Sequence, residues 1–137
     1  MIRVVLDTNV LVSALLQPLG PSAQIFLLAL AGAIQLCVSG AIYAEYEEVI
    51  NRPRFKLDQG TITATLQTIR EKALWVRPTQ SIQAFSDPDD DIFLECAFAA
   101  GAEYLVTGNW KHFPPSWAEI KIVTPRRLLE ILAEQSN

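Results

Sequence analysis

Asp7 is a carboxylate that lies between two apolar segments. The chain opens with MIRVVLDTNVLVSALL, in which residues 2–6 predict a buried strand and residues 10–16 predict an apolar helix. An uncompensated charge at such a packed junction costs several kcal/mol. A helix N-terminus, a basic partner or a metal ion could compensate it, so Asp7 is the first candidate for chemistry.

A second group of acids lies in the segment SDPDDD, residues 86–91. Part of it is explained as a helix start, with an aspartate as N-cap and a proline at the first helical position. Four aspartates exceed what capping requires, because like charges this close repel one another and a cation would relieve the repulsion. Asp90 shares its predicted helix face with apolar Leu94 and Ala97. We therefore favour Asp90 over Asp91 as the acid held against the core.

A third acid lies in the segment SGAIYAEYEEVINRP, which predicts a helix at residues 40–51 that ends before a proline. Two of its three glutamates fit a solvated helix face. Glu45 differs, because it lies on the stripe that contains Ile42 and Val49 and faces inward. Taken alone, this position is a weak indication of function.

Five short apolar runs predict strands, and the segments between them predict helices. Most of the runs are continuous rather than alternating, which is typical of strands covered by helices on both faces. This order predicts an α/β fold with a doubly wound, mainly parallel central sheet of about five strands flanked by helices. The strands are expected at residues 2–6, 34–39, 74–76, 103–107 and 120–124, and the helices at 10–16, 21–32, 40–51, 59–73 and within 86–102 and 124–135.

This architecture predicts where a site would lie. In open α/β sheets, ligands bind beyond the carboxyl ends of the strands, near a topological switch point. Asp7 follows the first predicted strand directly, and Thr107, Gly108 and Asn109 follow the fourth. Both groups are therefore expected at the ligand-binding edge of the sheet.

Composition excludes some classes of function. Of the 137 residues, 50% are hydrophobic and 19% are charged, which excludes a disordered chain. The net charge of −4 argues against a protein that binds nucleic acid through bulk positive charge. It is compatible with an enzyme that holds cations in an acidic pocket and contacts a polyanion through a local basic patch.

Two cysteines and one uncharged stretch bear on the compartment. Cys37 and Cys96 lie in apolar runs and lack the spacing of a zinc site, so we expect free, buried thiols in a reducing, cytoplasmic compartment. Residues 25–44 carry no charge and are long enough to span a bilayer. Glycines and polar residues divide this stretch into helix, turn and strand, so we expect a buried helix–strand unit, no signal peptide and no membrane contact.

Three blocks in this order, VVLDTNVLVSALL, VSGAIYAEYEEVINRPRF and DPDDDIFLECAFAAGAEYLVTGN, resemble the PIN-domain (PilT N-terminus-like) family. The match covers nearly the whole chain, so residues 1–137 are expected to form a single PIN-like domain. The resemblance implies a VapC-like, metal-dependent ribonuclease that cuts single-stranded RNA and serves as the toxin of a type II toxin–antitoxin pair.

The resemblance also implies which residues act. The family's three acids fall on Asp7, Glu45 and Asp90 as catalytic and metal-binding residues, with Asp91 as the alternative to Asp90. Three carboxylates that converge at strand ends would repel one another without a counterion, and oxygen-only ligands suit Mg²⁺ or Mn²⁺ rather than zinc. Supporting positions by the same match are Thr8, Asn9 and Thr107.

Asn109 is a departure from the family pattern. Many members carry an aspartate after the threonine that closes the fourth strand, whereas this chain has Asn109. An asparagine can coordinate a hard cation through its carbonyl oxygen but brings no charge. Asn109 is therefore expected to be an auxiliary ligand, and a second metal ion would be held less tightly.

Partners follow partly from charge and partly from the resemblance. The expected partners are an RNA substrate and a protein antitoxin, and the apolar second helix leaves a homodimer open. Two other functions also stay open. One is a catalytically weak PIN-like module that binds RNA or a protein partner. The other is a different metal-dependent phosphohydrolase, which is disfavoured because such enzymes usually place a second aspartate where this chain has Asn9.

Basic residues that could contact RNA are Arg52, Arg54, Lys56 and Lys111, with Arg126 and Arg127 as a further pair.

Overall fold

The computed structural model of this chain describes residues 1–83, 88–109 and 113–135. Its centre is a sheet of six strands in the order β3-β2-β1-β4-β6-β5. All neighbouring strands pair in parallel except β5 and β6, which form an antiparallel hairpin. The strands are β1 (Arg3–Leu6), β2 (Gln35–Val38), β3 (Leu74–Trp75), β4 (Tyr104–Val106), β5 (Ser116–Trp117) and β6 (Ile120–Val123).

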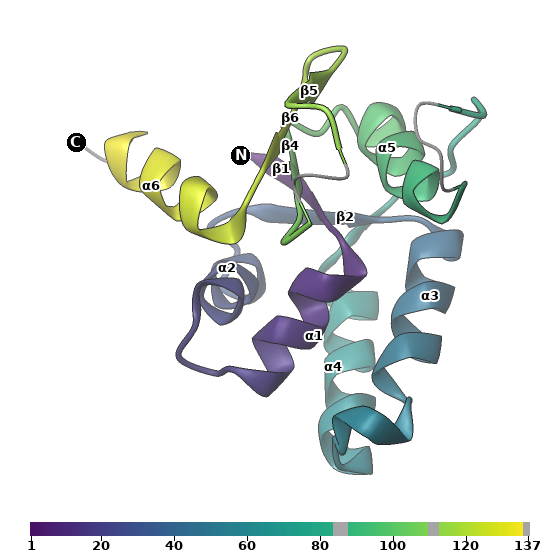
Figure 1. Ribbon diagram of the computed structural model, residues 1–137, viewed down its shortest axis with the longest axis vertical. Coiled ribbons are helices and arrows are strands. Elements are labelled where there is room, and N and C mark those ends of the chain that lie inside the picture. Colours follow the sequence, from purple (N-terminus) through teal and green to yellow (C-terminus); the bar gives the residue numbers. More distant parts are fainter. Residues whose placement is uncertain (84–87, 110–112, 136–137) are drawn as a thin grey trace.

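Helices cover both faces of this sheet. Figure 1 shows α5 on one side of the sheet, and α1, α2 and α4 on the other. Such two-sided cover explains why the central strands are continuous apolar runs. The helices are α1 (Thr8–Leu16), α2 (Pro21–Leu30), α3 (Gly40–Ile50), α4 (Gln59–Lys72), α5 (Pro88–Ala100) and α6 (Pro125–Gln135), with a short 3₁₀ helix, η1 (Pro53–Phe55).

The predicted α/β architecture is confirmed, and all five predicted strands are present. The structure adds β5, a two-residue strand on the outer edge of β6. The strand order places β1 between β2 and β4. The chain leaves β1 toward β2 and β3 and later returns to β4 on the other side of β1. The carboxyl ends of β1 and β4 therefore flank the topological switch point, where α/β sheets bind ligands.

The stretch at residues 25–44 is divided between helix α2, a turn, strand β2 and the start of α3. The predicted helix, turn and strand are thus present. Gly32 lies in the turn with a φ of 80°, a left-handed conformation that glycine adopts without strain. Among the described residues, no single helix is long and apolar enough to cross a membrane, and α1 and α2 reach that length only as a pair bent by 101°. Cys37 and Cys96 are free and buried, as expected.

Helix α3 begins at the carboxyl end of β2, and this start fixes the position of Glu45. Ser39 is the N-cap residue, and its side-chain oxygen accepts a hydrogen bond of 3.3 Å from the backbone N–H of Ile42. The buried stripe of the helix consists of Ile42, Tyr46 and Ile50. Glu45 lies at the border of this stripe and is half-buried.

Candidate active site

Asp7 lies at the end of β1 and is tied to the end of β4. Its backbone N–H donates to the carbonyl of Val106 at 2.9 Å. The hydroxyl of Thr107 donates to Asp7 Oδ2 at 2.7 Å and accepts a hydrogen bond of 3.0 Å from the backbone N–H of Asn109. Thr107 is completely buried, and Asp7 is 5% exposed. The structure therefore brings the first predicted acid and the fourth-strand threonine together at the switch point.

The carboxylate of Asp7 is compensated only in part by these contacts. Burial raises its pKa above the usual value, while the Thr107 hydroxyl and the backbone amides of Thr8 and Asn9 lower it. Asp7 is the N-cap residue of α1. Within the described part of the chain, no Lys, Arg or His forms an ion pair with Asp7. Of the three compensations that the sequence left open, the basic partner is therefore excluded for these residues.

Glu45 reaches the same region through Thr8. The hydroxyl of Thr8 donates a hydrogen bond to Glu45 Oε2, which links the first turn of α1 to the middle of α3. Since Thr8 directly follows Asp7, this bond places the Glu45 carboxylate beside the carboxyl end of β1. Glu45 therefore faces α1, although it lies at the border of the buried stripe rather than within it, and its role as a metal ligand stays a prediction.

Tyr46 also fixes α3 against β1, a role that the sequence did not reveal. Its hydroxyl donates to the carbonyl of Leu6 at 2.5 Å, directly before Asp7, and the side chain is 1% exposed. Burial raises the pKa of Tyr46 well above its usual value, so the phenol stays a donor. The only sequence signal was the helical spacing that puts Tyr46 between Ile42 and Ile50, and that spacing predicts packing rather than a hydrogen bond.

The aspartates of α5 differ from prediction in their burial. Asp91 is 6% exposed, whereas Asp90 is half-buried, so the prediction that Asp90 is the acid held against the core is wrong. Asp91 shares its helix face with Glu95, whose Oε2 accepts a hydrogen bond of 2.9 Å from the backbone N–H of Ile82. The backbone at Ile82 thus contacts this face, a tertiary effect that helical periodicity does not contain. A metal-binding role for either aspartate stays a prediction.

The remaining predicted positions lie around this edge or away from it. Asn9 and Asn109 are exposed. Lys111 lies outside the described residues. Arg52 forms an exposed ion pair of 2.8 Å with Glu48, and Arg54 lies over the ring of Phe55 at 4.8 Å. Lys56 ends η1 with a φ of 53°. Figure 1 places η1 beyond the end of α3 that is farther from β2.

The donor set around Asp7 fits a hard divalent cation. Carboxylate and hydroxyl oxygens from Asp7, Glu45 and Thr8 are the ligand types that Mg²⁺ and Mn²⁺ prefer. Within residues 1–83, 88–109 and 113–135, however, no group of three or more Asp, Glu, His or Cys side chains is arranged to hold a metal ion. Of the three predicted acids, the structure links Asp7 and Glu45, because Thr8 directly follows Asp7 and bonds Glu45.

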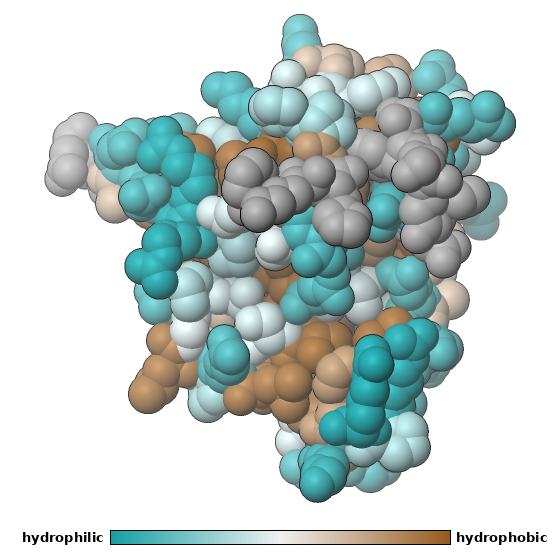
Figure 2. All heavy atoms as spheres, viewed as in Figure 1, coloured by the Kyte–Doolittle hydropathy of each residue, from teal (hydrophilic) through white to brown (hydrophobic). Residues whose placement is uncertain are grey.

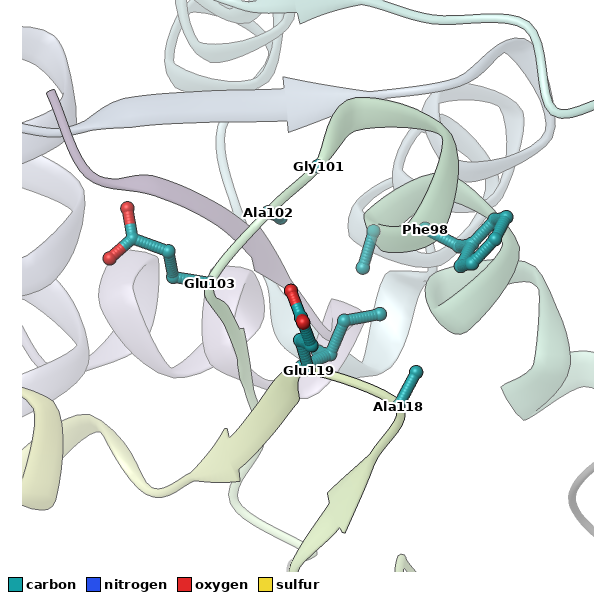
Figure 3. Close-up of a pocket in the computed structure, with 8 residues that line it drawn as sticks. Phe98, Gly101, Ala102, Glu103, Ala118 and Glu119 are labelled. Atoms are coloured by element: carbon teal, nitrogen blue, oxygen red, sulfur yellow. The ribbon is translucent and has the colours of Figure 1, made fainter.

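A separate apolar pocket lies at the opposite edge of the sheet. It has a volume of about 370 Å³ and is lined by the end of α5, the start of β4 and the β5–β6 turn. Figure 3 shows Glu103 pointing away from Phe98 and Gly101. Glu103 precedes β4, whereas Thr107 follows it. The length of β4 therefore separates this pocket from Asp7, and the pocket has no part in the chemistry proposed below.

Residues 3–111 match the family model described as PIN domain. The chain belongs to the PIN-domain family. A chain of the VapBC2 complex from Rickettsia felis, solved bound to a DNA fragment from its promoter, is similar in structure. The TM-score is 0.57 with 18% sequence identity, and the alignment covers 88% of this chain and 97% of that chain. At this identity the similarity shows the fold alone. No curated protein matches this chain in sequence.

Proposed function

We propose that this PIN domain is a Mg²⁺- or Mn²⁺-dependent endoribonuclease that cleaves single-stranded RNA. The observation that carries the proposal is the geometry of Asp7. Asp7 lies at the switch point, is buried, has a raised pKa and forms no ion pair among the described residues. A carboxylate in such a place is costly for the fold. Such a cost is typical of a site kept for ligand binding. Membership of a family of nucleases supports phosphodiester hydrolysis as the chemistry.

The proposed ligands of the cation are Asp7, Glu45 and one aspartate of α5, Asp90 or Asp91, with Asn109 as an auxiliary ligand. When bound, the cation would lower the pKa of a water molecule and neutralise charge on the scissile phosphate. The neighbouring threonines would position these ligands.

Thr107 and Thr8 hold the two central carboxylates in place. The Thr107 hydroxyl bonds Oδ2 of Asp7 and does not bond the other carboxylate oxygen. Thr8 fixes one oxygen of Glu45. Because neither threonine carries charge, they orient the carboxylates without neutralising them. The site thus keeps the negative charge that attracts a divalent cation.

RNA cleavage tests the proposal directly. Purified protein with Mn²⁺ is expected to cut an end-labelled single-stranded RNA, and EDTA or Asp7→Asn is expected to abolish cutting. Glu48→Gln is the matched control, because Glu48 is an exposed glutamate on the same helix as Glu45. Equal cutting by Asp7→Asn and wild-type protein would show that Asp7 is not required. Among the α5 aspartates, the stronger loss in Asp90→Asn or Asp91→Asn identifies the third ligand.

We further propose that the protein is the toxin of a toxin–antitoxin pair in the reducing cytoplasm. The fold shared with a chain of the VapBC2 complex supports this role. Apolar side chains gather over α1, α2 and the loop between them (Figure 2). Leu19 is 92% exposed, Leu27 59% and Leu16 46%. An antitoxin, or a second copy of the chain, would remove this surface from water. Copurification with the product of a neighbouring small gene, lost in Leu19→Lys, tests the antitoxin.

A second candidate function rests on Asn109. If the missing negative charge at that position leaves the cation weakly held, the domain would bind RNA or a protein partner without efficient cleavage. Metal titration separates the two functions. Absence of binding at millimolar Mg²⁺ or Mn²⁺ favours the binding module, whereas binding that depends on Asp7 favours the nuclease.

A further inference from the structure

A small pocket adjoins the Asp7 site on the side of α1. It has a volume of about 280 Å³ and forms where the first turns of α1, α2 and α6 meet the loop after β4. Asn9 and Gly108 line it. Asn9 is two residues from Asp7, and Gly108 directly follows Thr107, so the pocket and the proposed metal site share a border.

Two helix N-termini open into this pocket. Helix α2 starts there with Pro21 and Ser22, and α6 starts there with Pro125 and Arg126. No side chain of the described residues caps the amides at the start of α2, whose N-cap is Gly20. Helix N-termini carry partial positive charge and unpaired N–H groups, which favour anions and phosphate in particular. At α6 the Thr124 hydroxyl already accepts a hydrogen bond of 3.1 Å from the backbone N–H of Arg127, so the uncapped amides are those of α2.

Ser22 gives an independent indication of a ligand. It is 6% exposed, and its hydroxyl has no hydrogen-bond partner among the described residues. Every completely enclosed polar side-chain atom in that part of the chain has a hydrogen-bond partner. Since the Ser22 hydroxyl has none, its oxygen is not completely enclosed, and Ser22 lines the pocket. A buried hydroxyl held without a protein partner is a ready hydrogen-bond donor to a bound group.

Arg126 supplies a full positive charge at the same place. It is exposed, lines the pocket and forms no ion pair among the described residues. The next residue, Arg127, lies near Glu130 at 3.7 Å and Glu134 at 3.5 Å and does not line this pocket. Of two adjacent arginines, only Arg126 is thus available to an anion in the pocket.

We propose that this pocket binds the backbone phosphate of the RNA strand that neighbours the scissile phosphate. Ser22, Arg126 and the uncapped first-turn amides of α2 are its ligands. The scissile position itself rests on the proposed ribonuclease function. A phosphate anchored here would set the register of the strand across Asp7, and it explains how an acidic protein holds a polyanion without a large basic surface.

The test measures binding without cleavage. Fluorescence anisotropy of a labelled single-stranded oligouridine is recorded in EDTA at several salt concentrations. Each phosphate contact on a single strand contributes about 0.7 to the slope of log affinity against log salt. Arg126→Ala is expected to weaken binding about fivefold or more and to lower this slope by about 0.7. Arg127→Ala is the matched control and is expected to match wild type.

Ser22→Asp supplies a second variant that does not depend on loss of fold. An acid near a helix N-terminus stabilises the helix, so the thermal midpoint is expected to hold or rise while RNA binding falls. Equal affinity and slope for wild type and Arg126→Ala, or equal losses in Arg126→Ala and Arg127→Ala, would overturn the proposal.

Two further arms separate this subsite from its alternatives. Phosphorus NMR with inorganic phosphate shows whether the free ion binds. If Arg126→Ala removes phosphate binding and leaves RNA binding unchanged, the pocket takes free phosphate and the RNA proposal fails. If Arg126-dependent RNA binding is present while Mn²⁺ produces no cleavage, the subsite stands and the ribonuclease proposal fails. If Mn²⁺ produces cleavage and neither cleavage nor RNA binding changes in Arg126→Ala, the ribonuclease proposal stands and the subsite fails.

Discussion

The hydroxyl of Thr107 donates a hydrogen bond of 2.7 Å to Asp7 Oδ2, across 100 residues of sequence. This bond joins the carboxyl ends of β1 and β4, the two strands that flank the switch point. Because both residues are buried, neither group can replace the bond with bulk water. The position of Asp7, and with it the proposed metal site, therefore depends on Thr107.

Replacement of Thr107 by valine is expected to weaken the metal site while the fold persists. Valine keeps the shape of threonine but leaves Asp7 Oδ2 without its donor. Loss of a group that orients a metal ligand typically lowers metal affinity about 10- to 100-fold. Mn²⁺ titration by calorimetry measures this loss. Thr107→Ser keeps the hydroxyl and is expected to retain most of the affinity, and equal affinities for the valine variant and wild type would show that the bond does not orient Asp7.

Replacement of Asp7 by asparagine is expected to stabilise the metal-free protein at neutral pH. Burial raises the pKa of Asp7 in the folded state, so the folded protein binds this proton more tightly than the unfolded chain. Wild-type protein therefore loses stability relative to Asp7→Asn as pH rises from the ordinary carboxyl pKa of 3.8 through the raised pKa. At pH 7 in EDTA, the thermal midpoint of the variant is expected to lie a few degrees higher.

The pH profile gives the control for this effect. Below the unfolded pKa, Asp7 is protonated in both states, and the two midpoints are expected to converge. Added Mn²⁺ is expected to raise the midpoint of wild-type protein alone. A variant that is less stable than wild type at pH 7 in EDTA would mean that the Asp7 carboxylate is already well compensated by the protein.

Tyr46→Phe is expected to destabilise the fold by about 1–2 kcal/mol, because it leaves the buried carbonyl of Leu6 without its donor. Urea unfolding measures this change. Tyr43→Phe is the matched control, since the Tyr43 hydroxyl bonds exposed Arg70 at 2.8 Å and its ring is only partly buried. The control is expected to cost clearly less. Equal costs would show that the bond to β1 adds nothing beyond ring packing.

The cysteines are expected to resist alkylation in the folded protein. Burial raises the pKa of Cys37 to about 11 and that of Cys96 to about 12, so few thiolates form at pH 8. Iodoacetamide at pH 8 is expected to label neither residue within minutes, and to label both once urea has unfolded the chain. Mass spectrometry of the intact protein measures this, and rapid labelling without urea would contradict the burial of the thiols.

Much of the fold could be predicted from sequence because its central strands are buried on both faces. A short continuous apolar run such as that at β1 predicts a buried strand. Strand β5 could not be predicted, because its two residues, Ser116 and Trp117, carry no strand pattern and pair only through the hairpin with β6.

The candidate site could be predicted in part for the same reason. The strand-end rule placed Asp7 and Thr107 at one edge, and the structure joins them by a hydrogen bond. The relative burial of Asp90 and Asp91 could not be predicted, because the backbone at Ile82 contacts the Glu95 face of α5. Contacts between segments distant in sequence, such as Tyr46 to β1, are likewise not contained in periodicity.

The most direct test of a metal centre at the switch point is calorimetric titration of Mn²⁺ into wild-type protein, Asp7→Asn and Glu45→Gln, with Glu48→Gln as control. Wild type and Glu48→Gln are expected to bind Mn²⁺ with equal affinity. Asp7→Asn and Glu45→Gln are each expected to lose at least about tenfold in affinity, because each removes a charged ligand. Binding of Mn²⁺ to Asp7→Asn and Glu45→Gln as tightly as to wild type would contradict a metal centre at the switch point.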